Sequence, residues 1–160
     1  MYDHEVIPMK IISGGQTGAD RAALDAAMES DVATGGWVPK GRKAEDGPIA
    51  DTYSNLTETD SAHYETRTRF NVRDSDATLI LTHGELHGGS RFTRDEAESQ
   101  GKPYQHVDLN HYTIDEAVEL IRDWLEGLDG TTLNVAGPRE SSDPKIYKAT
   151  KEIVRGILKR

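Results

Sequence analysis

Three short segments rich in glycine, serine and threonine are the parts of this sequence best suited to hold a ligand. They span residues 14–18, 88–93 and 137–142. Small residues let backbone N–H groups approach a ligand, and hydroxyl and amide side chains donate hydrogen bonds to oxygen. Where such a segment leaves a strand and opens a helix, the free N–H groups and the helix dipole favour a phosphate. Together the segments predict an anion site for a phosphorylated ligand, although each alone is compatible with a simple turn.

The first segment fits neither of the two familiar glycine motifs. A Walker loop requires a lysine after its last glycine, and none follows Gly18. The dinucleotide fingerprint would fall on Ser13, Gly15 and Gly18, so its first glycine is missing. The acidic partner for a ribose is also missing from residues 34–38, where the second strand is expected. We therefore expect neither NAD nor ATP as the ligand.

Basic residues gather around the same segments, although the chain holds 28 acidic and 19 basic residues. A guanidinium such as that of Arg139 can hold a phosphate with two parallel hydrogen bonds. Lys40 and Arg42 are expected to contribute from a long aperiodic segment, the alternative for each being a solvated surface charge. Lys43 stands near Glu45 and is expected to be solvated. The predicted ligand-binding residues are Gly14, Gly15, Gln16, Thr17, Gly18, Lys40, Arg42, Gly88, Gly89, Ser90, Thr93 and Arg139.

Carboxylates and imidazoles form no clear catalytic or metal-binding pattern. Asp20 is expected in the first turn of a helix, where an acid favours the dipole without any catalytic role, but it stays a candidate acid or base. His83 and His87 are four residues apart in a segment that contains glycine rather than on a helix, so no metal site is expected. Trp37 follows two glycines, and its ring is suited equally to stacking on a heterocycle and to burial.

Composition limits the class of protein. The 160 residues suffice for one domain with a core, and the net charge of −9 argues against a broad nucleic-acid-binding face. There is no cysteine, no apolar run long enough for a membrane helix and no signal-peptide pattern, so we expect a cytoplasmic protein without a membrane partner. Residues 1–8 are interpreted as an N-terminal extension and residues 9–160 as one domain.

Strand and helix patterns alternate along that domain. Strands are expected at residues 9–13, 31–36, 77–81, 104–109 and 131–136. Helices are expected at 20–30, 60–72, 91–100, 113–125 and after the sequence Ser142-Asp143-Pro144, with a long loop at 39–55. This order predicts an α/β fold with an open, mostly parallel sheet and helices on both faces. Ligands bind such sheets beyond the carboxyl ends of the strands, where the three glycine segments are expected.

Several stretches resemble, in order, the family of putative molybdenum carriers. They are residues 13–25, 35–42, 44–47, 71–81, 88–93, 101–104 and 134–139. The resemblance implies a three-layer Rossmann-like domain, related to the lysine decarboxylase-like phosphoribohydrolases and to DNA-processing Rossmann domains. It also implies a carrier or sensor that binds a phosphorylated heterocycle, either molybdenum cofactor (a pterin phosphate with a dithiolene-bound metal) or a nucleotide-like compound.

The chain departs from the phosphoribohydrolases at their catalytic motif, Pro-Gly-Gly-x-Gly-Thr-x-x-Glu. Aligned on Gly88 and Gly89, it has Arg91 for glycine, Phe92 for threonine and the shorter Asp95 for glutamate. We therefore favour binding without catalysis. The alternative is a hydrolase of nucleoside phosphates or ADP-ribose-like compounds, with Asp95, Asp20 or Glu140 as acid or base and residues 39–55 as a lid. A protein-interaction domain and a homo-oligomer are also compatible with the sequence.

Overall fold

Six parallel strands form one sheet in the computed structural model, which describes residues 8–130 and 132–159. The order across the sheet is β3-β2-β1-β6-β4-β5, and every pairing between the described strands is parallel. The strands are β1 Lys10–Ile12, β2 Ala33–Val38, β3 Leu56–Glu58, β4 Ala77–Thr82, β5 Tyr104–Asp108 and β6 Thr132–Ala136. The helical elements are α1 Ala19–Glu29, η1 Lys40–Arg42, α2 Tyr64–Asp74, α3 Gly88–Ser99, α4 Ile114–Glu126 and α5 Ile146–Leu158. The expected α/β class is confirmed.

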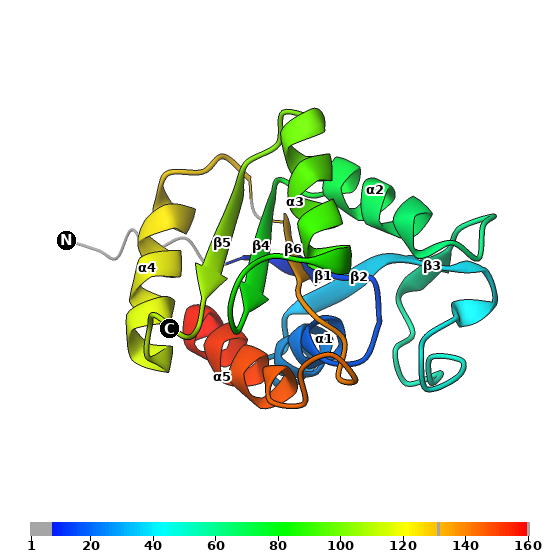
Figure 1. Ribbon diagram of the computed structural model, residues 1–160, viewed down its shortest axis with the longest axis horizontal. Coiled ribbons are helices and arrows are strands. Elements are labelled where there is room, and N and C mark those ends of the chain that lie inside the picture. Colours follow the sequence, from blue (N-terminus) through cyan, green and yellow to red (C-terminus); the bar gives the residue numbers. More distant parts are fainter. Residues whose placement is uncertain (1–7, 131, 160) are drawn as a thin grey trace.

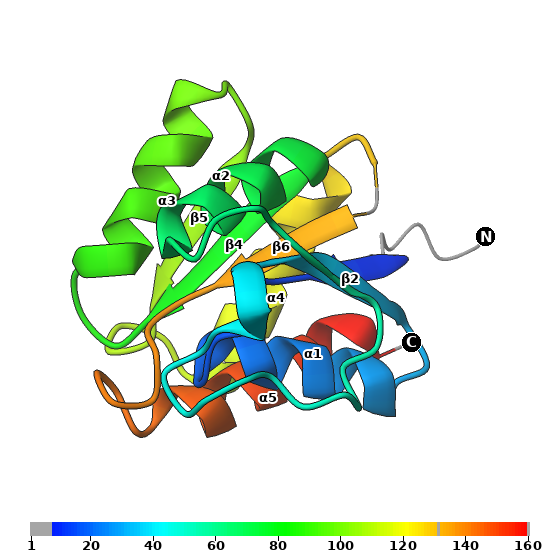
Figure 2. The same cartoon turned by 90° about the vertical axis from the view of Figure 1, so that its right-hand side faces the viewer.

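Helices cover both faces of the sheet, as expected. Helices α2 and α3 pack on one face, and α1, α4 and α5 pack on the other (Figures 1 and 2). The face under α1, α4 and α5 carries the main apolar core, which includes Leu79, Leu81 and Val135. Five buried alanines of α1 (Ala19, Ala22, Ala23, Ala26 and Ala27) present little side-chain bulk. They therefore let α1 lie close to its neighbours in the core.

The opposite face is more polar. Because side chains alternate along a strand, Thr78 and Asn134 point away from the apolar core, toward α2 and α3. Both are buried, and Asn134 Nδ2 donates to Thr78 Oγ1 at 3.2 Å. Thr68 and Asn71 of α2 are also buried. A polar layer of this kind is costly unless its groups are paired, and it borders the cleft described below.

The strand order reverses beside β1. The chain runs outward from β1 through β2 to β3, crosses to β4 and β5, and then returns with β6 between β1 and β4. The carboxyl ends of β1, β6 and β4 are therefore neighbours, at the kind of switch point where doubly wound sheets bind ligands. The segments that follow these strands include all three predicted glycine segments.

Some boundaries differ from those expected. Strand β3 was not predicted: it has three residues at a sheet edge, pairs with β2 through Trp37 and Thr57, and is too short to show a period. Helix α2 begins at Tyr64 rather than at residue 60. Helix α3 begins at Gly88, three residues early, because its glycines are part of the first turn. Helix α5 begins at Ile146, so Pro144 precedes the helix instead of occupying its first position. The expected extension at residues 1–8 lies, except for its last residue, outside the described residues, as does residue 131.

Candidate functional site

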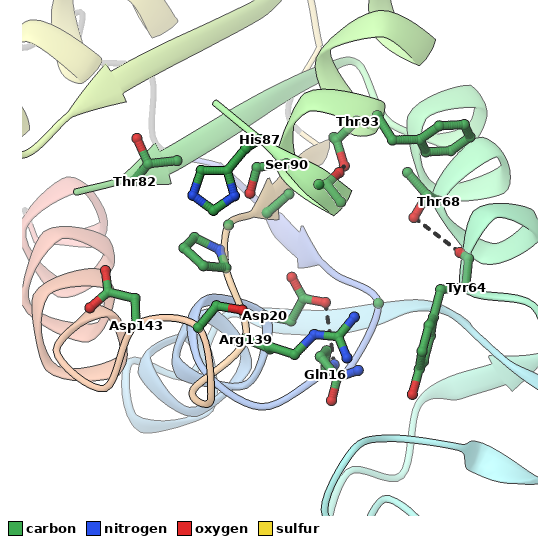
Figure 3. Close-up of a pocket in the computed structure, with 18 of the residues that line it drawn as sticks. Gln16, Asp20, Tyr64, Thr68, Thr82, His87, Ser90, Thr93, Arg139 and Asp143 are labelled. Atoms are coloured by element: carbon green, nitrogen blue, oxygen red, sulfur yellow. Dashed lines mark hydrogen bonds between the residues drawn. The ribbon is translucent and has the colours of Figure 1, made fainter. Parts of the chain in front are cut away.

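A cleft of about 780 Å³ lies at this edge of the sheet, bordered by α2, α3 and the segments that follow β1, β4 and β6 (Figure 3). Its volume is in the range of small-molecule sites. Seven of the predicted ligand-binding residues line it: Gly14, Gln16, Gly88, Gly89, Ser90, Thr93 and Arg139. The three segments singled out from the sequence are thus brought together at one cavity.

The other predicted residues of the first segment do not line the cleft. Gly15 faces Val38 and Ile49, and Gly18 has a φ of +80° and lies so close to Pro138 that a Cβ would collide with the Pro138 carbonyl oxygen. The Thr17 hydroxyl accepts a hydrogen bond from Glu140 N at 3.1 Å and donates one to the carboxylate of Glu45. These residues shape the wall of the cleft, and their direct contact with a ligand stays a prediction.

Lys40 and Arg42 also lie outside the lining of the cleft. The Arg42 guanidinium donates to three backbone carbonyls, those of Ile49, Ala50 and Tyr53, at 2.8–2.9 Å. It therefore holds the long loop in shape. Lys40 belongs to the η1 turn. A ligand role for either residue stays a prediction.

Several backbone N–H groups at the N-terminus of α1 and just before it already donate to acceptors of the protein itself. Gln16 N donates to Asp20 Oδ2 at 3.2 Å, and Thr17 N donates to Gln16 Oε1 at 3.0 Å. Ala19 N donates to the carbonyl of Pro138 at 3.2 Å. A carboxylate and two carbonyl oxygens of the protein thus accept the bonds that a bound phosphate would accept at a bare helix end.

The N-terminus of α3 is arranged differently. Its N-cap residue, His87, makes no side-chain capping hydrogen bond, and Gly88, Gly89 and Ser90 all line the cleft. Because the first N–H groups of a helix have no partner within it, this end offers donors and positive dipole to a ligand. Of the two helix ends predicted to hold an anion, α3 has the more accessible one.

Asp20 is the buried acid of the site. Its side chain lines the cleft, the residue is 6% exposed, and Arg67 Nη2 lies 3.9 Å from its Oδ2 atom. Burial disfavours the carboxylate and raises its pKa from 3.8 to about 6, even though Arg67 and the Gln16 N–H act to lower it. Asp20 is therefore a group that can gain or lose a proton near neutral pH.

Arg67 is a site residue that the sequence analysis missed. Its buried guanidinium donates to the carbonyl of Tyr64 at 2.9 Å and to the hydroxyl of Thr68, and burial lowers its pKa. It passes so close to Gly14 that a Cβ there would collide with the guanidinium. The glycine is thus required by an arginine 53 positions away in the sequence, which no local pattern reveals.

Three cations surround the ring of Tyr64, which the sequence analysis also missed. Arg67 Cζ, Arg139 Cζ and Lys43 Nζ lie 5.2, 5.4 and 4.8 Å from its centroid. Lys43 is exposed, as expected of a solvated charge, but it adds to this cluster. Within the described part of the chain, the Arg139 side chain makes no hydrogen bond or ion pair. Gln16 Nε2 is buried and likewise has no partner there. The cluster thus places three cationic side chains around Tyr64, and the donors of Arg139 and of Gln16 Nε2 are available to a ligand.

The long loop is fastened to the cleft through residues 43–47. Glu45 accepts from Ser141 N at 3.1 Å, from Ser141 Oγ at 2.5 Å and from the Thr17 hydroxyl, and these hydrogen bonds lower its pKa. Asp46 pairs with Arg21 at 2.7 Å. Glu45 therefore joins the long loop to two of the glycine segments, although none of residues 39–55 lines the cleft, and a role of this loop as a lid stays a prediction.

Two imidazoles also line the cleft, and one has a fixed partner. His83 Nδ1 lies 2.6 Å from Asp143 Oδ2, and His87 projects into the cleft from the start of α3 (Figure 3). Among the described residues, no group of three metal-ligating side chains is found. Sequence reasoning could not pair His83 with Asp143, because 60 residues separate them.

The acids proposed by analogy with the phosphoribohydrolases lie elsewhere. The Asp95 carboxylate is exposed, pairs with Arg94 at 2.9 Å and does not line the cleft, and Glu140 is exposed outside it. Trp37 is also outside: its indole N–H donates to Asp74 at 2.8 Å. Of the three acids proposed from the sequence as acid or base, Asp20 is the one that lines the cleft.

The fold defines a Rossmann-like class of protein with a cleft of ligand size, and comparison with known proteins names the group. Residues 11–158 match the model of the circularly permutated YpsA SLOG family, and the chain belongs to this family. SLOG is a Rossmann-like group, so the relationship expected from the sequence is confirmed.

A solved structure is similar over nearly its whole length. It is the crystal structure of a protein named putative molybdenum carrier protein, from Syntrophus aciditrophicus SB. The two chains are 48% identical, the match covers 96% of this chain and 97% of the other, and the TM-score is 0.92. A search of curated proteins found no match. No helix in the described part of the chain is long and apolar enough to cross a membrane.

Proposed function

We propose that this protein is a carrier or sensor that binds a phosphorylated heterocycle in the cleft, either molybdenum cofactor or a nucleotide-like compound. The observation that carries the proposal is the meeting of three groups in one cavity: the N-terminus of α3, the Arg139 guanidinium and the amide nitrogen of Gln16. Among the described residues, neither the guanidinium nor this nitrogen has a hydrogen-bond partner. The name of the similar protein from Syntrophus aciditrophicus supports a molybdenum-related ligand.

In this proposal each part of the ligand meets a different set of donors. The N–H groups of residues 88–90 and the Arg139 guanidinium hold the phosphate, since both favour anions. Gln16 Nε2 donates to a carbonyl or ring nitrogen of the heterocycle. The chain contains no cysteine, so a molybdenum ion would reach the cleft already bound by its own dithiolene rather than by a protein thiolate.

The proposal is tested by ligand-induced stabilisation. Purified protein is screened with ADP-ribose, nucleoside monophosphates, pterin phosphates and molybdate, and saturation at 100 times Kd is expected to add about 2.7 kcal/mol of stability. Arg139→Ala and Gly89→Asp should abolish the shift. Arg155→Ala is the matched control, because Arg155 pairs with Glu29 on the surface away from the cleft. If none of these compounds binds at micromolar concentration, the proposal is wrong.

A hydrolase is the second candidate, and Asp20 is the observation that favours it. A carboxyl group with a pKa of about 6 in a ligand-sized cleft can serve as acid or base at neutral pH. The substrate would be a nucleoside phosphate or an ADP-ribose-like compound, cleaved at its glycosidic bond. Release of free base, detected by mass spectrometry, should be lost in Asp20→Asn and kept in Asp95→Asn. If every bound ligand is recovered intact, the hydrolase is ruled out and the carrier function is the one that remains.

A further inference from the structure

Asp143 lies at the side of the cleft opposite Tyr64 (Figure 3), and it forms a fixed pair with His83, which also lines the cleft. Asp143 Oδ2 lies 2.6 Å from His83 Nδ1, while its other oxygen accepts from Lys145 N at 3.0 Å and so anchors the carboxylate at the start of α5. An ionised carboxylate only accepts hydrogen bonds, so Nδ1 carries the proton. In the neutral ring Nε2 then carries the lone pair, and it has no hydrogen bond within the described part of the chain.

The loop that carries His83 is held from the neighbouring strand. Thr82 Oγ1 donates to the carbonyl of Gly84 at 2.6 Å and lies 2.7 Å from His106 Nε2 on β5. Gly84 N donates to Asp108 Oδ1 at 2.8 Å. Both flanks of His83 are thus tied to the sheet, so the imidazole is positioned from its backbone as well as through Asp143.

The pair is enclosed but remains open to a ligand. The side chains of His83 and Asp143 are 26% and 16% exposed. Both line the same cleft as the N-terminal residues of α3. A histidine held at Nδ1 by a carboxylate, with Nε2 free, is the arrangement that enzymes use to remove a proton from a hydroxyl or a water. The carrier function proposed above gives this pair no role.

We propose that His83 is a general base that activates water to hydrolyse a phosphoanhydride bond in the bound ligand, with Asp143 as its positioning residue. The proposal rests on the proposed binding of a phosphorylated ligand. It adds a reaction at phosphorus, distinct from glycosidic cleavage, and a substrate class, diphosphate-linked compounds.

The step balances without a further reagent. The water oxygen forms a bond to one phosphorus as the bridging P–O bond of the diphosphate breaks. His83 Nε2 takes the proton from the water and later releases it to solvent. The second phosphate leaves as an anion and needs no proton. Arg139 and the N–H groups of α3 neutralise the charge that develops on the phosphate oxygens.

ADP-ribose in water enriched in ¹⁸O tests this reaction directly. The expected products are AMP and ribose 5-phosphate, with one ¹⁸O atom in a phosphate. His83→Asn should lower the rate about 10²- to 10⁴-fold and keep the thermal shift with ADP-ribose. Asp143→Asn should lower kcat and leave KM nearly unchanged, since the carboxylate orients His83 without touching the substrate. His63→Asn is the control: His63 is exposed and lies outside the lining of the cleft.

The outcomes separate the two proposals. Binding of ADP-ribose without cleavage overturns the hydrolysis and leaves the carrier function standing. Cleavage with ¹⁸O in ribose and release of adenine, or cleavage that survives His83→Asn, also overturns it. If ADP-ribose and the other compounds of the screen fail to bind, both proposals are wrong.

Discussion

Replacing Asp20 by asparagine should make the protein more stable at neutral pH. The native carboxyl has a pKa of about 6, against 3.8 for the unperturbed group, because burial penalises its charge more than Arg67 and the Gln16 N–H favour it. At 1.36 kcal/mol per pH unit, this difference means that the ionised side chain costs about 3 kcal/mol of folding free energy above pH 6. An asparagine removes the charge and its oxygen can still accept from Gln16 N.

The sign of the effect depends on pH. Between pH 3.8 and about 6 the folded state binds more protons than the unfolded state, so the wild type loses stability as pH rises through this window. The free energy of unfolding of Asp20→Asn should therefore exceed that of the wild type by about 2–3 kcal/mol at pH 8 and equal it near pH 4. For a chain of this length the gain at pH 8 corresponds to roughly 5–10 °C in Tm.

Urea denaturation of both proteins at pH 8 and pH 4 measures this difference. Glu119→Gln, a change at an exposed position on α4, is the matched control and should stay within about 0.5 kcal/mol of the wild type at both pH values. An Asp20→Asn variant that is less stable at pH 8 would refute the reasoning, because it would show that the ion pair with Arg67 outweighs the cost of burial.

Three further changes test how the cleft is held together. Gly14→Ala should displace the Arg67 guanidinium, destabilise the protein by about 1–3 kcal/mol and weaken ligand binding, as measured by urea denaturation and thermal shift. Glu45→Ala should speed hydrogen exchange in residues 43–47 while changing global stability by less than about 1 kcal/mol, because Glu45 is exposed. Asp25→Ala should cost about 1–3 kcal/mol by urea denaturation, since its carboxylate accepts from the hydroxyls of two tyrosines on separate elements. Unchanged exchange in residues 43–47 would contradict the role of Glu45 as a fastening, and an Asp25→Ala variant as stable as the wild type would contradict the cross-link.

The elements whose hydrophobic pattern extends over many residues were predictable from the sequence. The continuous apolar run of β4 and the helical spacing of the apolar residues of α4 are both visible in the sequence, and α4 begins with a capping box formed by Thr113 and Glu116. Strand β3 was not predictable, because three residues at a sheet edge carry no period. The start of α3 was misplaced because glycine is read as a turn residue, although here it opens the helix.

The site was predictable where it is local in sequence and not where it depends on pairing. Glycine segments after strands pointed to Gly14 and Gly88 without any knowledge of their neighbours. The role of Arg67 could not be predicted, because it depends on contacts with Gly14 and Asp20, which are distant in the sequence and close only in the fold. The pairing of His83 with Asp143 is of the same kind: two ordinary residues acquire chemistry only when β4 and β6 become neighbours.

The raised pKa of Asp20, which lowers the stability of the protein at neutral pH, should also make ligand binding depend on pH. An anion bound beside Arg139 would raise the Asp20 pKa further, because Arg139 is among the charges that now act to lower it. Binding should therefore take up protons between about pH 6 and 8 and tighten as pH falls through this range. Calorimetric titration of a stabilising ligand in two buffers of different ionisation enthalpy measures the uptake, which Asp20→Asn should remove. An uptake that persists in the variant would assign the proton to another group and leave the buried charge of Asp20 without a role in binding.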